Sequence, residues 1–239
     1  MTIPGVSVIV PAYNRERYLG AALESALGQD HQPLEIIVVD DGSTDGTARV
    51  ARSFTGVRYL YQSNQGAASA RNAGIAASRG EHLAFLDSDD VWAPEKLRLQ
   101  VDALRQHPGV GYCLTRLQNF LEPGCPVPSW IGPEQFSRAE FGIGTCTLMA
   151  RREVFDRVGG FDPQYRWASD KDWFFRAKDA RIALAILPEV LVHRRIHDGN
   201  LSASSEPSLL LLARMIKASV DRMRAQAGPA GIAGRAGAP

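Results

Sequence analysis

The sequence predicts an α/β fold with a doubly wound, mostly parallel sheet. Short, β-branched apolar runs alternate with helical patterns through the first half of the chain, as in parallel sheets covered by helices on both faces. Polar turn residues follow these runs, where ligands of such folds gather, at the carboxyl ends of the strands. The length of 239 residues suits one large domain of this class.

The first predicted unit is a buried strand over Val6–Val10 and a helix whose apolar residues keep helical spacing up to Leu27. We expect Asn14 to be the N-cap of this helix. Three further units follow, with strands over Leu34–Val39, Val57–Tyr61 and Leu83–Leu86 and helices ending near Phe54, covering Gly66–Ser78 and following Pro94.

The pattern is less regular in the second half. Residues Glu122–Gly132 are rich in proline and glycine and predict a surface loop. Beyond it we expect a strand over Thr145–Ala150, a Gly159-Gly160 turn, a helix through Trp173 and a strand near Val190. Tryptophans 92, 167 and 173 could stack on a ligand ring, but core packing is the leading interpretation.

A further helix is predicted from Pro207 to Met223, with an apolar face and a basic face. Such a helix can dock on its own domain, on a second subunit or on a membrane surface. The Gly/Ala/Pro-rich residues 228–239 have too few apolar side chains to fold and predict a disordered tail.

Composition narrows the function classes. The formal net charge is only +1, so nothing suggests nucleic-acid binding, which leaves a strongly basic footprint. Cys113, Cys125 and Cys146 form neither an even set nor a C-x-x-C pair, which argues against a disulfide framework and a zinc knuckle. The sequence shows neither a secretory signal nor a membrane span, so we expect a cytoplasmic protein. Peripheral contact with the inner face of the cytoplasmic membrane stays open.

Acidic residues follow two of the predicted strands. After the fourth strand come Asp87, Ser88, Asp89 and Asp90, and in an extended chain Asp87 and Asp89 would face the same way. Two such carboxylates suit Mg²⁺ or Mn²⁺, although the acids could merely turn the chain. After the second strand, Asp41 could accept the N3–H of a uracil or thymine ring or a ribose hydroxyl.

The turn after the first strand excludes two common nucleotide sites. It reads Pro11-Ala12-Tyr13-Asn14 and has neither the glycines of a dinucleotide-binding turn nor those of a P-loop. Classical NAD enzymes and P-loop phosphate-transfer enzymes are therefore disfavoured, although Tyr13 could still face a nucleobase.

Taken in order, these motifs resemble family 2 glycosyltransferases of the GT-A fold. The resemblance covers nearly the whole chain up to about Ser202. It is carried by Val8–Asn14, Val39–Asp45, Asn64-Gln65-Gly66, Ala70–Gly74, Phe85–Asp90, Gly159–Asp162, Asp170–Trp173 and Arg195-Ile196-His197.

The resemblance implies transfer of a sugar from a nucleotide-diphospho-sugar to an acceptor hydroxyl with inversion, assisted by Mn²⁺ or Mg²⁺. Asp89 would bind the metal, with His197 as a further ligand. Asp170 would be the catalytic base, although the glutamate that usually precedes it is Ser169 here. Residues implied to bind the donor are Pro11, Tyr13, Asp41, Asn64, Arg71, Asp87 and Ser88.

We also expect successive segments of the chain to have separate roles. Residues 1–120 would bind the nucleotide sugar, residues 121–205 would form the acceptor-binding and catalytic-base half of the same domain, and residues 206–227 would form the C-terminal helix. The Q-x-x-R-W motif of processive synthases is absent, which favours a single-transfer enzyme. A UDP-sugar is the favoured donor, and the acceptor stays open.

Two alternatives stay open from the sequence. Asp87 to Val91 also resembles the D-x-D-x-V nucleophile motif of haloacid-dehalogenase-like phosphatases, but that motif usually lies near the N-terminus. A scaffold that binds a nucleotide sugar without transferring it is the other alternative. The joint presence of Asp41, Asp87, Asp89 and Asp170 argues against it.

Overall fold

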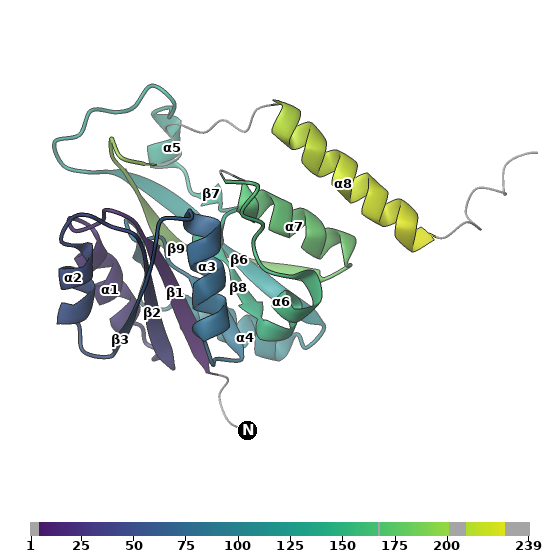
Figure 1. The fold of residues 1–239 in the computed structure, drawn as a ribbon, viewed down its shortest axis with the longest axis horizontal. Coiled ribbons are helices and arrows are strands. Elements are labelled where there is room, and N and C mark those ends of the chain that lie inside the picture. Colours follow the sequence, from purple (N-terminus) through teal and green to yellow (C-terminus); the bar gives the residue numbers. More distant parts are fainter. Residues whose placement is uncertain (1–4, 167, 201–208, 228–239) are drawn as a thin grey trace, which may run out of the picture.

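A nine-stranded sheet runs through the computed structural model, which describes residues 5–166, 168–200 and 209–227 (Figure 1). Its order is β3-β2-β1-β4-β8-β6-β9-β5, and β7 pairs with β6. The strands are β1 (Val6–Ala12), β2 (Glu35–Asp41), β3 (Val57–Gln62), β4 (His82–Phe85), β5 (Val91–Trp92), β6 (Val110–Leu121), β7 (Glu140–Phe141), β8 (Met149–Arg151) and β9 (Ala183–Ile196).

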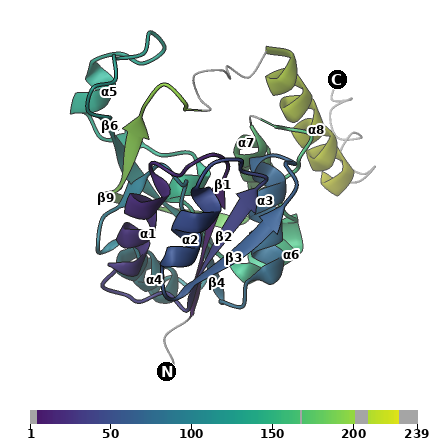
Figure 2. The same cartoon turned by 60° about the vertical axis from the view of Figure 1, so that its left-hand side comes forward.

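Helices cover both faces of this sheet (Figures 1 and 2). They are α1 (Leu19–Leu27), α2 (Thr47–Ser53), α3 (Ala67–Ala77), α4 (Lys96–Gln106), α5 (Glu134–Ser137), α6 (Arg152–Val158), α7 (Ser169–Asp179) and α8 (Leu209–Ala227), with a 3₁₀ turn η1 at Thr145–Thr147.

The four strands of the first half pair in parallel, as the sequence predicts. β1 is buried along its whole length and lies between β2 and β4, with Val8 opposite Ile36 and Ile9 opposite Phe85. Val8 joins the core under α1 and α4, while Ile9 joins the core on the α3 face, because successive side chains of a strand point to opposite faces. The predicted α/β fold is confirmed.

The second half contains more strand than the sequence predicts. β6 and β9 are long partners, but only a short strand near Val190 is expected from the sequence, and α6 is not expected. Strands β8, β7 and β5 pair antiparallel with their neighbours, so this half of the sheet is mixed. The ladder between β6 and β9 has three register shifts, which disturb the two-residue alternation that would reveal a strand.

The predicted N-cap at Asn14 is wrong. The first helix begins at Leu19 after Tyr18, whereas Asn14 has a φ of 52° and accepts a hydrogen bond from the Thr44 N–H at 2.8 Å. Its own N–H donates to Ser43 Oγ at 2.9 Å. Asn14 therefore ties the loop after β1 to the loop after β2, and both loops border the site described below.

Two of the three tryptophans lie in the core, as expected. Trp92 is 3% exposed, and Trp173 is fully buried and stacks on Phe155 at a centroid distance of 4.9 Å. Residue 167 lies outside the described part of the chain, and so do residues 201–208 and 228–239, which include the predicted tail.

Helix α8 packs on α7. Asp179, in the last turn of α7, accepts hydrogen bonds from Ser219 Oγ and Arg222 Nε, each at 2.7 Å, and Met215 is buried. Among the described residues, no helix is long and apolar enough to cross a membrane.

A lysine is buried in the core beneath the sheet. Lys96 is fully buried in the first turn of α4, where its Nζ donates to Gln100 Oε1 at 2.7 Å and lies 4.0 Å from the ring centroid of Trp92. Burial lowers the pKa of Lys96 to about 7, against a smaller opposing effect of Cys113 and Cys146. The ammonium form is therefore poorly accommodated in the fold.

We expect this lysine to make stability depend on alkaline pH. Between about pH 7 and its unfolded pKa of about 10.4, the unfolded chain holds a proton that the folded chain does not, so the free energy of unfolding rises with pH there. Relative to Lys96→Met, the wild type should lose on the order of a few kcal/mol between pH 10 and pH 7. Urea unfolding of both proteins across this range measures the difference, and a constant difference would contradict the prediction.

Candidate functional site

The candidate site lies where the strand order reverses. The chain moves outward from β1 to β2 and β3 and then returns to β4 on the other side of β1, and ligands of such sheets bind at this crevice. A cavity of about 230 Å³ opens there. Eight residues predicted to bind donor or metal line it, namely Pro11, Tyr13, Asp41, Asn64, Arg71, Asp87, Ser88 and Asp89.

Asp41 holds the loop after β3 against this cavity. Its Oδ1 accepts hydrogen bonds from Gln62 Nε2 at 2.7 Å and from the Gln65 N–H at 2.9 Å, and its Oδ2 accepts one from the Gly66 N–H at 2.8 Å. A carboxylate has about four acceptor positions, so one remains for a ligand.

The next residue, Gly42, makes this loop arrangement possible. Its φ is +81°, and a Cβ there would lie 2.8 Å from the Asn64 nitrogen. Glycine is therefore needed both for the backbone conformation and for the close approach of the two loops.

Arg71 links the predicted donor residues to the predicted base. Its Nη2 donates to Asp87 Oδ1 at 2.8 Å, while its Nε is buried without a partner in the described part of the chain. Asp170, in the first turn of α7, is close enough to feel the charge of Arg71. Arg71 lines the cavity, where its guanidinium charge suits an anionic ligand.

Asp170 does not line the cavity itself but lies beside it. Its Oδ2 and Cys146 Sγ both lie 3.9 Å from the position that a Cβ on Gly144 would occupy. Burial raises the pKa of Asp170; Arg71 opposes this rise and Asp87 adds to it. The carboxyl group therefore holds a proton more readily than an ordinary aspartate.

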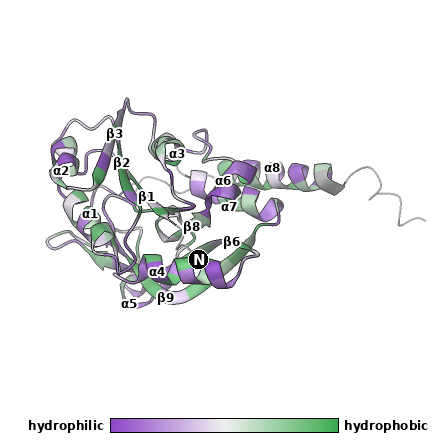
Figure 3. Cartoon of the chain, turned by 90° about the horizontal axis from the view of Figure 1, so that it is seen from below, coloured by the Kyte–Doolittle hydropathy of each residue, from purple (hydrophilic) through white to green (hydrophobic). Residues whose placement is uncertain are grey.

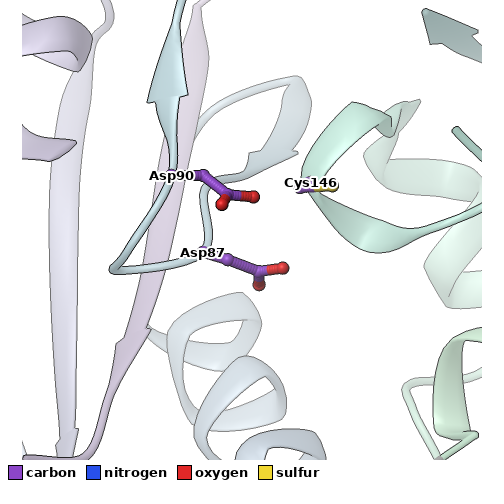
Figure 4. A group of neighbouring side chains, drawn as sticks. All are labelled: Asp87, Asp90 and Cys146. Carbon is purple, nitrogen blue, oxygen red and sulfur yellow. The ribbon is translucent and has the colours of Figure 1, made fainter. Parts of the chain in front are cut away.

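The extended chain assumed for Asp87 to Asp89 is not found, although both side chains line the same cavity. Residues 87–90 form a tight turn in which the Asp90 N–H donates to the Asp87 carbonyl at 3.0 Å, whereas the expectation assumed an extended chain. The turn instead brings together Asp87 and Asp90, whose carboxylate oxygens and Cys146 Sγ lie within 4.8 Å of one another (Figure 4).

As it stands, this cluster is poorly suited to a metal ion, because metal ions need deprotonated ligands. Burial raises the pKa of Asp90 well above the ordinary aspartate value, and the charges of Asp89 and Asp87 raise it further. Burial likewise raises the pKa of the Cys146 thiol well above its usual range. A neutral thiol is also a poor partner for Mg²⁺, which prefers oxygen ligands.

Asp89 turns toward His197 and Arg15. Its Oδ2 lies 3.1 Å from His197 Nε2 and 3.3 Å from Arg15 Nε. Burial alone would raise the pKa of Asp89, but the hydrogen bond from His197 and the charge of Arg15 outweigh it and lower the pKa.

The tautomer of His197 follows from its neighbours. The Gly199 N–H donates to Nδ1 at 3.0 Å, so Nδ1 is the acceptor and Nε2 carries the proton that is donated to Asp89. His197 is 1% exposed, and its ring lies 4.4 Å from that of Tyr18. The imidazole is therefore held firmly behind Asp89.

Several residues that line the cavity are not predicted by the sequence pattern. They include three arginines, Arg15, Arg166 and Arg194, and one asparagine, Asn200. The position of Arg15 directly after the turn that follows β1 could have identified it. Arg166 and Arg194 come from the second half of the chain, where the sequence pattern does not reveal which segments face the cavity. With Arg71, the cavity lining thus has four arginines beside the four aspartates Asp41, Asp87, Asp89 and Asp90.

The chain matches the family model described as "Glycosyl transferase family 2" over residues 7–161. This chain belongs to glycosyl transferase family 2. The matched range contains β1 from its second residue onward, β2, β4 and the predicted donor residues, whereas Asp170 and His197 lie beyond it.

Curated relatives agree with this family. An uncharacterized glycosyltransferase of Rickettsia typhi is 32% identical over 208 residues, which are 82% of this chain and 65% of the relative. An uncharacterized glycosyltransferase of Nostoc sp. is 35% identical over 223 residues, which are 85% of this chain and 69% of the relative. The chain thus spans about two thirds of the length of these relatives.

Solved structures support the GT-A fold. S. aureus TarS in complex with UDP-GlcNAc has a TM-score of 0.73 at 22% identity, over 91% of this chain and 66% of that one. TarS in complex with UDP has a TM-score of 0.67 at 24% identity, over 80% of this chain and 60% of the TarS chain. The family match also disfavours the haloacid-dehalogenase-like phosphatase alternative.

Proposed function

We propose that this family 2 glycosyltransferase transfers a sugar from a nucleotide-diphospho-sugar to an acceptor hydroxyl with inversion. The observation that carries the proposal is that three elements bring charged side chains to one cavity, with Asp170 beside it: Asp41 at the end of β2, Arg71 on α3, and Asp87 and Asp89 in the turn after β4. A UDP-sugar is the favoured donor, and the UDP and UDP-GlcNAc bound to TarS support this choice.

The cavity offers a distinct partner for each part of such a donor. The open acceptor position of Asp41 suits the N3–H of a uracil ring or a ribose hydroxyl, and Tyr13, which is 46% exposed, can cover the base. Arg71 and Arg15 provide positive charge for the diphosphate. Pro11, Asn64 and Ser88 complete the proposed donor-binding set.

The proposed reaction is a single displacement. The acceptor oxygen attacks the anomeric carbon and passes its proton to a carboxylate oxygen of Asp170, while the bond from the anomeric carbon to the diphosphate oxygen breaks. The leaving nucleoside diphosphate takes the bonding electron pair, and Arg71 stabilises the charge that it gains. Attack opposite to the leaving group inverts the anomeric configuration.

Asp89 and His197 are the proposed ligands of a divalent cation. A carboxylate oxygen and an imidazole nitrogen 3.1 Å apart form a donor set that Mn²⁺ accepts, and Mg²⁺ would rely more on Asp89. When bound, the ion would neutralise charge on the diphosphate. For His197 to ligate through Nε2, its proton must move to Nδ1, so the Gly199 N–H must give up its present hydrogen bond.

We expect the raised pKa of Asp170 to affect how the rate of transfer depends on pH. The ionised carboxylate is the base, so kcat/KM should fall as the pH drops through this pKa, at a higher pH than an ordinary aspartate would give. Because Arg71 favours the ionised form, Arg71→Gln should move the acid limb to still higher pH. Profiles of kcat/KM against pH for both proteins provide the test, and an unmoved limb would show that another group is titrating.

Product analysis tests the proposed function. The protein is incubated with UDP-sugars and a panel of hydroxyl acceptors, release of UDP is measured, and the anomeric configuration of the product is assigned by NMR. We expect a glycoside of inverted configuration. Tight UDP binding without transfer to any acceptor would favour the non-catalytic scaffold, and a retained configuration would refute the single displacement.

A further inference from the structure

Helix α8 presents a row of apolar side chains to solvent. Leu212, Ile216 and Met223 are 36%, 48% and 48% exposed, and their spacing places them on one side of the helix. The adjoining side packs on α7 through Met215 and Ser219. Figure 3 shows α8 extending beyond the sheet, with hydrophobic and hydrophilic residues alternating along it.

Cationic side chains border this α8 row. Lys217 directly follows Ile216 in the sequence, and Arg224 directly follows Met223. Arg214 lies farther round the helix, and all three cationic side chains are exposed. The α8 sequence has four basic residues and one acidic residue, Asp221, which pairs with Lys217 at 2.6 Å. An apolar row beside an excess of positive charge is typical of helices that lie in the surface of an anionic bilayer.

A second apolar pair lies beside the segment that approaches Asp170. Phe141 and Ile143 are 64% and 66% exposed and come just before Gly144, the residue that approaches Asp170. Helix α7 carries Asp170 in its first turn and binds α8 through Asp179 in its last turn. Helix α7 therefore connects the proposed base, which lies near the Phe141 and Ile143 segment, to the helix that carries the α8 row.

We propose that the α8 row docks on the surface of an anionic lipid bilayer and that the acceptor hydroxyl belongs to a lipid-carried molecule held there. This proposal rests on the proposed function, because it names the acceptor class for the same site. Phe141 and Ile143 would contact the apolar part of that acceptor.

The charges favour a bilayer over a second copy of the chain. Pairing two α8 rows about a two-fold axis would bring the cations of both helices together, with only Asp221 on each to offset them. Anionic headgroups instead neutralise Arg214, Lys217 and Arg224, whose long side chains can reach the headgroup level while the apolar row is buried.

Vesicle flotation tests the docking with the full chain. The vesicles contain phosphatidylcholine alone or phosphatidylcholine with phosphatidylglycerol. We expect flotation with phosphatidylglycerol, weakened by salt, and a loss of about tenfold or more in bound protein for the triple variant Leu212→Gln, Ile216→Gln and Met223→Gln. The matched control variant, Leu34→Gln, Leu184→Gln and Ile186→Gln, removes three exposed aliphatic side chains elsewhere and should float like the parent.

Each outcome decides the proposal. It is overturned if the parent does not float, if the α8 variant floats equally well, or if the parent sediments as a dimer that the α8 substitutions dissociate. The thermal shift given by UDP is measured on the same proteins. Flotation without any nucleotide-dependent shift would count against the proposed function and the acceptor class that rests on it, but not against the docking. A shift without flotation would count against the docking and not against the proposed function.

Discussion

Replacing Asp170 with asparagine is expected to abolish sugar transfer while leaving donor binding nearly intact. The substitution keeps the size of the side chain but removes the oxygen that would accept the proton from the acceptor hydroxyl. General base catalysis contributes roughly 10² to 10⁴ in rate, so we expect kcat to fall about 10³-fold or more. The Kd for UDP should change little, because Asp170 lies beside the donor cavity and does not line it.

Asp156→Asn is the control for this substitution, because Asp156 is exposed on α6, away from the cavity. It should leave both kcat and the Kd for UDP unchanged. If Asp170→Asn retains transfer, the base is another group. If it weakens UDP binding as much as it slows transfer, then Asp170 has a structural role in the donor site.

Replacing Asp89 with alanine is expected to weaken nucleotide binding mainly when a divalent cation is present. In the presence of Mn²⁺ we expect UDP affinity to fall about tenfold or more, because Asp89 would hold the ion, and the ion would neutralise charge on the diphosphate. In EDTA the two proteins should differ much less. Calorimetric titration with UDP under both conditions measures the difference.

Asp30→Ala is the matched control for this substitution, because it also removes an ion-paired aspartate. Asp30 pairs with Arg98 at 2.7 Å and lies outside the cavity. It should leave UDP affinity unchanged with or without Mn²⁺. An equal loss for Asp89→Ala in both conditions would instead assign Asp89 a structural role, through its contacts with Arg15 and His197.

The sequence predicts the donor side of the site well for a physical reason. Carboxyl ends of neighbouring parallel strands share one edge of a sheet, so the residues at or just after the ends of β1, β2 and β4 must lie close together once the strands are recognised. Pro11, Asp41 and Asp87 meet this condition, and the structure places all three around one cavity.

The second half could not be predicted to the same degree. β6 and β9 are separated by more than sixty residues, and their bulged ladder hides the alternation that would reveal them as partners. Their pairing decides where Arg194 and His197 lie. The turn that joins Asp87 to Asp90 is a local feature, but an acidic tetrapeptide gives no indication of whether the chain there is extended or turned.

The most direct test of the account is the stability of the protein with nucleotides. A thermal-shift panel with UDP, dTDP, GDP, CDP and ADP and their common sugars, each with and without Mn²⁺, measures selective binding to the folded state. We predict a metal-dependent rise in Tm that is largest for UDP or a UDP-sugar and is reduced in Asp89→Ala. The absence of a shift for every nucleotide and sugar would contradict a nucleotide-sugar site in this cavity.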